Sequence, residues 1–371
     1  MRRDIIRPCP MAVIAALVLP LLSMGSSRAD DFTPGRDSLY ISDQSGLPFN
    51  PPTFLGTVSN FKASNGTFQG VLINATVGGT ATPGYPGGFC FTPNGIVVSP
   101  VSPPQLVVAN QNICDGNGEI KAFDEATGAL KSTLVASTDQ NAPSVPFGIL
   151  LYLGELLIAD EAGKVEVFDA TTRPATFSTN LDTTGYANAS CFSPFGMVVG
   201  PDGYLYVATR CGSGGDVIRF NLNTNSFIEV FVSGASCGCL DHPSAVVFGA
   251  DGRLYVTSSR PAPATGAPSN DTDKIVIFDA NGHFVDKIDL DQPGAMVRSA
   301  APGLLFGPQG LLYVTIAQLN SSGMPTGVGS VRRYNVASKQ YRDIVPPNTN
   351  LGLPTLFTFG GTDPATLAYR K

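Results

Sequence analysis

A two-segment stretch recurs along this chain, and the repeat restricts the possible folds more than any other feature. Each copy has an apolar segment of about six residues, a turn and a second apolar segment, which is typical of a β-hairpin. The copies are "PFGMVVGPDGYLYVATR" from Pro194, "PSAVVFGADGRLYVTSSR" from Pro243, "PGLLFGPQGLLYVTIA" from Pro302, "PFGILLYLGELLIADEAG" from Pro146 and the more diverged "PNGIVVSPVSPPQLVVANQN" from Pro93.

The turns within the copies have the residues that a tight turn requires. In Gly200–Gly203, Pro201 presets φ for the second position, Asp202 can bond its own backbone, and a glycine takes the last position at low steric cost. The segments 249–252 and 307–310 repeat this pattern. The copies are therefore predicted to be hairpins and not the starts of helices.

A third and a fourth segment follow each hairpin. The third ends in an aromatic residue and often Asp or Asn, as in "GEIKAFD", "GKVEVFD", "GDVIRFN", "DKIVIFD" and "GSVRRYN". A polar turn then leads to a fourth strand, as in "NLNTNSFIEVFV". Four antiparallel strands at a period of 48 to 62 residues indicate propeller blades, because one such sheet cannot bury both of its faces alone.

The two ends of the chain together complete one more blade. Near the N-terminus, "SLYISDQSG" and "GTVSNFKASNGTFQGVLI" supply a second, third and fourth strand without a first. At the other end, "DPATLAYR" from Asp363 resembles a first strand. We therefore predict an all-β, six-bladed β-propeller of four-stranded antiparallel blades, a single domain over residues 30–371. Pairing of residues near 364–370 with residues near 38–43 would close it and remove the open edges.

The first 29 residues are predicted to be a signal peptide. They combine an Arg-rich start, an apolar stretch from Met11 to Met24 and small residues up to Ala29. Export to a periplasmic or extracellular location follows, with Cys9 removed; a retained N-terminal anchor is the alternative, and no later segment is long and apolar enough to span a membrane. The net charge of −6 argues against nucleic acid or an anionic membrane surface as a partner.

The repeats "PFGMVVGPDGYLYVATR…GDVIRFN" resemble those of NHL-repeat propellers and of the related SMP-30/gluconolactonase and strictosidine-synthase-like six-bladed propellers. The resemblance covers nearly the whole chain after residue 29. It implies the architecture much more than the function, because propellers carry many unrelated activities. Propeller geometry also implies that the starts of the inner strands and the loops after the second strands surround one mouth of the central channel.

That geometry, applied to the repeat, places two pairs of cysteines at equivalent positions of two blades. Cys191 and Cys211 flank one hairpin, and Cys90 and Cys114 flank another. We expect disulfides Cys90–Cys114 and Cys191–Cys211, in keeping with an exported chain. Cys237 and Cys239 have no such counterpart: they form a local disulfide, stay as free thiols, or join His242 in a site for a soft metal.

The mouth defines a set of candidate ligand-binding residues. They carry charges of both signs, which suits a small polar ligand, although loops around a propeller mouth are polar in any case because their backbones need partners. The candidates are Asp43, Asn94, Asn110, Asp160, Glu161, Arg210, Asp241, His242, Arg260, Arg298 and Gln318.

Two functional hypotheses remain open from the sequence. The first is an exported propeller that binds a small molecule, a polymer or a protein at the mouth or at a rim of loops, without catalysis. The second, implied by the resemblance to gluconolactonases, is a lactonase or hydrolase that uses Ca²⁺ or another divalent metal. Asn94, Asp160 and Asp241 are its candidate ligands, although the aspartate that the family carries at a later inner strand is absent. Streptogramin-lyase-like propellers imply His242 as a general base.

Overall fold

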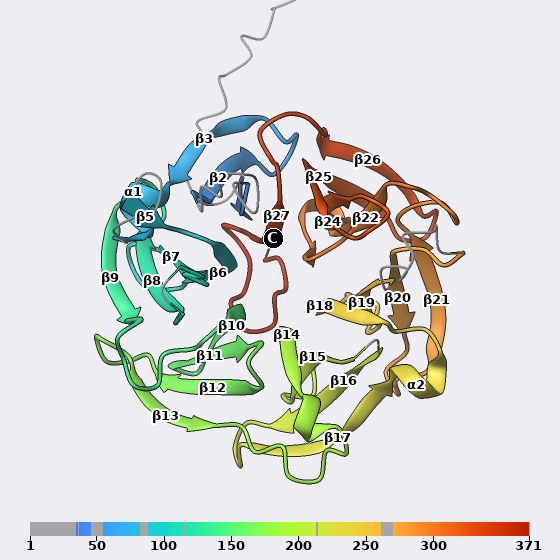
Figure 1. Ribbon diagram of the computed structural model, residues 1–371, viewed down its shortest axis with the longest axis horizontal. Coiled ribbons are helices and arrows are strands. Elements are labelled where there is room, and N and C mark those ends of the chain that lie inside the picture. The colour runs from blue at the N-terminus through green and yellow to red at the C-terminus, as the bar shows by residue number, and fades with distance from the viewer. Residues whose placement is uncertain are drawn as a thin grey trace, which may run out of the picture. The chain divides into compact units, whose positions relative to one another are not determined.

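Six β-sheets are arranged radially around a central channel, as the repeat predicts (Figure 1). This computed structural model describes residues 35, 37–45, 55–81, 88–114, 116–212, 214–260 and 270–370. The predicted signal peptide, residues 1–29, and Cys9 lie outside the described residues. Among the described residues, no helix has the length and apolar character needed to cross a membrane.

Each sheet is an antiparallel blade whose first strand lines the channel and whose fourth strand lies at the rim (Figure 1). Blades 2 and 3 are β6 (Pro93–Ser99), β7 (Gln105–Asn110), β8 (Glu119–Asp124) and β9 (Leu130–Val135), then β10 (Pro146–Tyr152), β11 (Glu155–Asp160), β12 (Lys164–Asp169) and β13 (Thr176–Asn180). Blades 4 and 5 are β14 (Ser193–Val199), β15 (Leu205–Cys211), β16 (Gly214–Asn221) and β17 (Ser226–Ser233), then β18 (His242–Phe248), β19 (Leu254–Ser259), β20 (Lys274–Phe278) and β21 (Phe284–Asp289).

Blades 1 and 6 depart from this plan. In blade 6 the first strand is split into β22 (Arg298–Ala300) and β23 (Leu304–Phe306), followed by β24 (Leu312–Leu319), β25 (Pro325–Asn335) and β26 (Gln340–Val345). Blade 1 combines β27 (Pro354–Phe359) with β1 (Ser38–Asp43), β2 (Thr57–Lys62) and β3 (Phe68–Ile73). Short elements join the blades: α1 (Ala75–Gly78), β4 (Thr80–Ala81), β5 (Phe89–Cys90) and α2 (Gly234–Cys237).

Burial follows the position of a strand within its blade. The strand β7 is buried along almost its whole length, because the neighbouring blades cover both of its faces. The rim strand β3 is instead largely exposed. The near-continuous apolar runs of the repeat are therefore the inner strands, and the mixed segments are the rim strands.

A glycine near the start of the inner strands lets these strands converge on the axis. A Cβ atom on Gly148 would lie 2.5 Å from the carbonyl oxygen of Phe195 in the next blade, and one on Gly196 would lie 2.5 Å from that of Ser244. The same position is a bulge, since the pairing of β14 with β15 shifts register between Pro194 and Met197. The recurring proline and glycine thus set how closely the blades approach.

The ring closes through a different C-terminal segment from the one expected. The strand β27, Pro354–Phe359, pairs with β1, so the last strand does complete the first blade, but the pairing expected for residues 364–370 is wrong. Those residues follow a turn in which Asp363 Oδ1 accepts hydrogen bonds from the amides of Ala365 and Thr366. Both edges of β1 are occupied, one by β2 and the other by β27, so residues 364–370 have no free edge of β1 to pair with.

The C-terminal tail instead crosses the end of the channel, where Figure 1 shows it over the centre. The amide of Leu151 donates to the carbonyl of Pro364, and that of Val199 donates to the carbonyl of Ala365. Leu367 packs against apolar clusters from several blades. Since Leu151 and Val199 lie at the far ends of their inner strands, the tail covers one end of the channel and leaves the other as the mouth.

Three disulfides are present among the described residues. Cys90–Cys114 and Cys191–Cys211 are the two pairs expected from the repeat. Cys237 and Cys239 form the third, which settles the alternatives for this pair in favour of a local disulfide. The first two lie at the mouth end of blades 2 and 4.

Candidate functional site

The open end of the channel holds a cavity of about 510 Å³. Its walls come from the first residues of the inner strands and from the residues that end the second strands. The polar lining residues are Gln44, Asn94, Gln111, Glu161, Arg210, His242, Ser244, Ser259, Arg260, Arg298, Ser322 and Thr355. Deeper in the channel, apolar side chains of the inner strands and Leu367 leave a space of only about 40 Å³.

Three of the expected mouth residues hold the backbone instead of facing the cavity. The carboxylate of Asp43 accepts hydrogen bonds from the amides of Ser45, Gly352 and Leu353, at 2.8 to 2.9 Å. Asp160 accepts from three amides in the same manner. Asn110 accepts from two. All three are almost fully buried.

These three residues brace the loop that leads into the inner strand of their own blade. Asn110 pairs with Pro93 across the hairpin, and Asp160 pairs with Pro146. Each therefore lies beside the recurring proline, where the incoming loop has unpaired amides. The equivalent hydroxyl of Thr209 accepts from the amide of Ser193. The side chain at this position therefore binds the backbone of the incoming loop and does not face the cavity. The side chain of the next residue reaches the cavity.

Polar side chains at the position after the loop-bracing residue form a hydrogen-bonded chain around blades 1 to 3. Gln44 Nε2 donates to Asn94 Oδ1 at 2.8 Å and to Gln111 Oε1 at 3.4 Å. Gln111 Nε2 donates in turn to Glu161 Oε1 at 3.4 Å. The nitrogen of Asn94 lies 3.3 Å from the carbonyl oxygen of Pro146. One side of the mouth is therefore an amide network that ends in a carboxyl group.

Arg210 faces this network from blade 4. Its guanidinium carbon lies 3.5 Å from the centre of the Phe195 ring, and it donates to the carbonyl of Pro243 at 3.1 Å and to the hydroxyl of Ser244. No carboxylate lies within 4.0 Å of it among the residues described. Burial lowers the pKa of Arg210 to about 10, which leaves it charged at neutral pH.

Glu161 and His242 are the titratable neighbours of Arg210. Burial raises the pKa of Glu161 to about 7, against an opposing effect of the positive charge of Arg210. Burial, reinforced by the charge of Arg210, lowers the pKa of His242, so this imidazole is neutral at pH 7. The Nδ1 atom of His242 is shielded from solvent and has no hydrogen-bond partner among the described residues. The mouth thus carries a cation beside a carboxyl group whose pKa lies close to neutral pH.

The other two arginines of the mouth are already paired. Arg298 forms two hydrogen bonds to the carboxylate of Asp273, at 2.7 and 3.2 Å. Arg260 lies 3.8 Å from Asp291. Burial and the charge of Asp273 raise the pKa of Asp291 to about 6, so it is mainly ionised at pH 7. Of the three arginines that line the cavity, Arg210 is thus the one that no carboxylate contacts within the described ranges.

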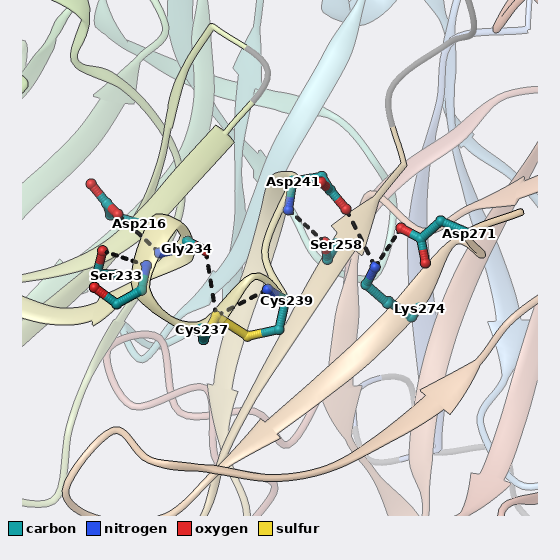
Figure 2. The surroundings of a disulfide bond; sticks show 10 residues. Asp216, Ser233, Gly234, Cys237, Cys239, Asp241, Ser258, Asp271 and Lys274 are labelled. Carbon is teal, nitrogen blue, oxygen red and sulfur yellow. Dashed lines mark hydrogen bonds and ion pairs between the residues drawn. A yellow bond between two sulfur atoms is a disulfide. The ribbon is translucent and has the colours of Figure 1, made fainter. Parts of the chain in front are cut away.

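Two sequence-predicted candidates do not line the cavity. Asp241 lies 3.3 Å from Lys274, which also contacts Asp271, and its amide donates to the hydroxyl of Ser258 (Figure 2). Gln318 lies on β24 opposite Ser299. The mouth therefore combines Asn94, Glu161, Arg210, His242, Arg260 and Arg298 from the predicted set, without Asp43, Asn110, Asp160, Asp241 or Gln318.

The residues of the mouth do not fit a divalent metal. Asn94 already uses both ends of its amide, the oxygens of Asp160 accept from backbone amides, and Asp241 is paired with Lys274. Across the described ranges, no group of three or more His, Cys, Asp or Glu is arranged to hold a metal ion. A hard cation prefers several oxygen ligands, and this mouth instead presents a guanidinium.

Among the polar lining residues, sequence reasoning missed Gln44, Gln111, Ser244, Ser259, Ser322 and Thr355. A signal for three of them was present in the repeat, because Gln44, Gln111 and Ser259, like Glu161 and Arg210, each follow the residue that braces the loop. Side chains of successive strand residues point in opposite directions. Once the first of each pair is known to be buried, the second is expected in the channel.

No protein-family model matches this chain, and no curated protein matches its sequence. Solved structures with a similar fold include a putative 6-phosphogluconolactonase from Bacteroides fragilis, at 13% identity and a TM-score of 0.52, covering 88% of this chain and 99% of that one. A protein from Lactobacillus plantarum has 12% identity and a TM-score of 0.53, with coverages of 87% and 99%. A luciferin-regenerating enzyme has 14% identity and a TM-score of 0.51, with coverages of 87% and 93%. At these identities the similarity is one of fold.

Proposed function

We propose that the chain binds a small organic anion at the mouth of its channel, with Arg210 as the anchor for a carboxylate or phosphate group. The observation that carries this proposal is a partly buried guanidinium that borders a cavity of about 510 Å³ and contacts no carboxylate among the described residues. Arginine suits this role because its planar fork can hold two oxygens of an anion at once.

The amide network supports a ligand that also carries hydroxyl groups. Gln44 and Gln111 border one wall of the cavity with amide groups that can donate and accept hydrogen bonds. Amide side chains of this kind bind hydroxyl groups in either direction. Phe147 and Phe195 add apolar surface to the cavity. The chemical class is therefore a small hydroxylated acid or a phosphorylated sugar.

The test is a binding measurement on the purified chain with two arginine variants. A thermal-shift screen of hydroxy acids, sugar acids and sugar phosphates selects a ligand, and calorimetry then measures its Kd. We expect Arg210→Gln to weaken binding at least about thirtyfold, since a charged hydrogen bond of about 2 kcal/mol is lost. The control Arg253→Gln, at an exposed arginine outside the cavity, retains the original Kd. Equal Kd values for both variants would refute the proposal.

Hydrolysis of a lactone without a metal is the second candidate function. A carboxyl group with a pKa of about 7 suits a general base at neutral pH, and Arg210 lies where it can stabilise a developing negative charge. The name of one solved structure with this fold, a putative 6-phosphogluconolactonase, points the same way. Hydrolysis of a lactone panel in the presence of a chelator is the assay. Glu161→Gln is expected to abolish turnover while ligand binding persists; no turnover by the unaltered chain excludes this candidate.

We also propose that the chain is exported from the cytoplasm. The leader-like residues 1–29 and the three disulfides support an oxidising destination. Mass spectrometry of the protein recovered outside the cytoplasm is expected to give a chain that begins near Asp30. Recovery of the complete chain with Met1 and Cys9 would contradict cleavage.

A further inference from the structure

The third disulfide differs from the other two in its exposure. Cys237 is exposed and Cys239 is partly buried, whereas Cys90 is fully buried and its partner Cys114, like Cys191 and Cys211, is partly buried. The bond begins at the last residue of α2, Gly234–Cys237, and Figure 2 shows its surroundings. A thiolate from solution can therefore approach this bond more easily than the other two.

The Cys237–Cys239 bond also contributes least to the fold. It joins cysteines two residues apart, whereas the other disulfides join cysteines 24 and 20 residues apart. The stabilisation that a cross-link provides grows with the length of the loop it closes. A two-residue ring restricts the unfolded chain little, so the pair can be reduced with little loss of stability.

Contacts other than the disulfide hold the surrounding loop on both sides. The amide of Gly234 donates to Asp216 at 3.1 Å, and the amide of Ser236 donates to the hydroxyl of Ser233 at 3.3 Å. After the ring, Leu240 is buried and the amide of Asp241 donates to Ser258 at 3.0 Å (Figure 2). These bonds remain when the sulfur–sulfur bond breaks, so the two thiols would stay close together.

The two sulfurs are not equivalent. The amide of Cys239 lies 3.2 Å from Sγ of Cys237 and donates to it. Between them, Gly238 adopts a left-handed conformation with φ of 59°, which brings this amide back toward the sulfur. A backbone donor stabilises a thiolate, so Cys237 is the better leaving group.

A cavity of about 490 Å³ lies beside this pair and provides room for a substrate. Its walls include both cysteines, Phe231 from β17, and His283 and Phe284 from the turn into β21. Phe284 is 52% exposed. Exposed aromatic rings beside a disulfide suit an extended peptide with an apolar side chain next to its own cysteine.

We propose that Cys237–Cys239 is a thiol–disulfide exchange site that oxidises the dithiols of a protein or peptide. A substrate thiolate attacks Sγ of Cys239, the bond between the two cysteine sulfurs breaks, and Cys237 leaves as a thiolate. The second substrate thiolate then attacks the substrate sulfur of the mixed disulfide and releases Cys239. The substrate loses two electrons and two protons, and the cysteine pair gains both. This activity is independent of the ligand proposed for the mouth.

The test uses the purified oxidised chain and a reduced synthetic peptide with two cysteines beside a phenylalanine. Site-resolved alkylation and mass spectrometry follow each disulfide in time. Cys237–Cys239 is expected to open at least about tenfold faster than Cys90–Cys114 and Cys191–Cys211, with one peptide disulfide formed for each chain. Reaction with glutathione is expected to give an adduct on Cys239.

The double variant Cys237→Ser and Cys239→Ser is the control. It is expected to keep the Tm of the unaltered chain within about 2 °C and to form no peptide disulfide. Equal opening rates for the three pairs would overturn the proposal, as would peptide oxidation by the double variant. A large fall in its Tm would also contradict the proposal, because the ring would then be structural.

Discussion

Replacing Glu161 by glutamine is expected to stabilise the chain at high pH and to leave its stability unchanged at low pH. Burial raises the pKa of this carboxyl group from 4.5 to about 7. A carboxyl group with a raised pKa binds its proton more tightly in the folded state, so the folded state loses stability as pH rises from 4.5 through 7. Glutamine has no charge to bury, and its carbonyl can still accept from Gln111.

The size of this effect follows from the pKa. A change from 4.5 to about 7 corresponds to about 3.4 kcal/mol at full effect, at about 1.36 kcal/mol for each pKa unit. Glu161 is half-buried and borders a cavity open to solvent, so screening reduces the expected gain to about 1–2 kcal/mol. In a chain of this length, that gain corresponds to a rise in Tm of about 1–3 °C.

The assay compares thermal unfolding of Glu161→Gln and the unaltered chain at pH 4.0 and at pH 8.5. The control is Glu229→Gln. In the unaltered chain the exposed carboxylate of Glu229 pairs with Arg219 at the rim, and removing this pair is expected to change the free energy of unfolding by less than about 0.5 kcal/mol at pH 8.5. The reasoning is refuted if Glu161→Gln unfolds at the same temperature as the unaltered chain at pH 8.5, or if it is equally stabilised at both pH values.

Three further predictions concern the fold. Gly196→Ala places a Cβ atom 2.5 Å from the next blade and is expected to lower the free energy of unfolding by about 1–3 kcal/mol, measured by urea denaturation. An unchanged midpoint of unfolding would contradict the close approach of the inner strands. Replacing Cys191 and Cys211 together by serine removes a cross-link over 20 residues and is expected to lower the free energy of unfolding by about 3 kcal/mol in the same assay. The same replacement at Cys237 and Cys239 is expected to change it little. Leu367→Ala, in the tail, is expected to cost about 1–2 kcal/mol and to speed amide hydrogen exchange at Leu151; unaltered exchange there would show that the tail does not cover the channel.

The fold followed from the sequence because its information is local. A hairpin with Pro201, Asp202 and Gly203 in its turn is specified within a few residues, and the repeat shows where the next hairpin begins. The strand that closes the ring was harder to predict from the sequence. Both Pro354–Phe359 and the segment from Asp363 carry a proline followed by apolar residues, and only the pairing of the first of them with β1 in the folded chain decides between them.

The site was only partly predictable for a related reason. The repeat assigns the place of a residue along its strand only to within one residue, and the direction of the side chain reverses from each residue to the next. Asp160 and Glu161 are neighbours in sequence, yet one braces the backbone and the other lines the mouth. That no carboxylate of the described part of the chain contacts Arg210 depends on residues from several blades, which no single repeat specifies.

The proton balance of ligand binding tests the central claim most directly. An anion bound beside Arg210 would raise the pKa of the nearby Glu161 above about 7, so binding would take up a proton. Calorimetry of one ligand at pH 7.5, in two buffers of different ionisation enthalpy, measures this uptake. The account predicts an uptake of about half a proton or more for the unaltered chain and none for Glu161→Gln. Binding that leaves the proton balance unchanged, or that survives Arg210→Gln at full affinity, would contradict it.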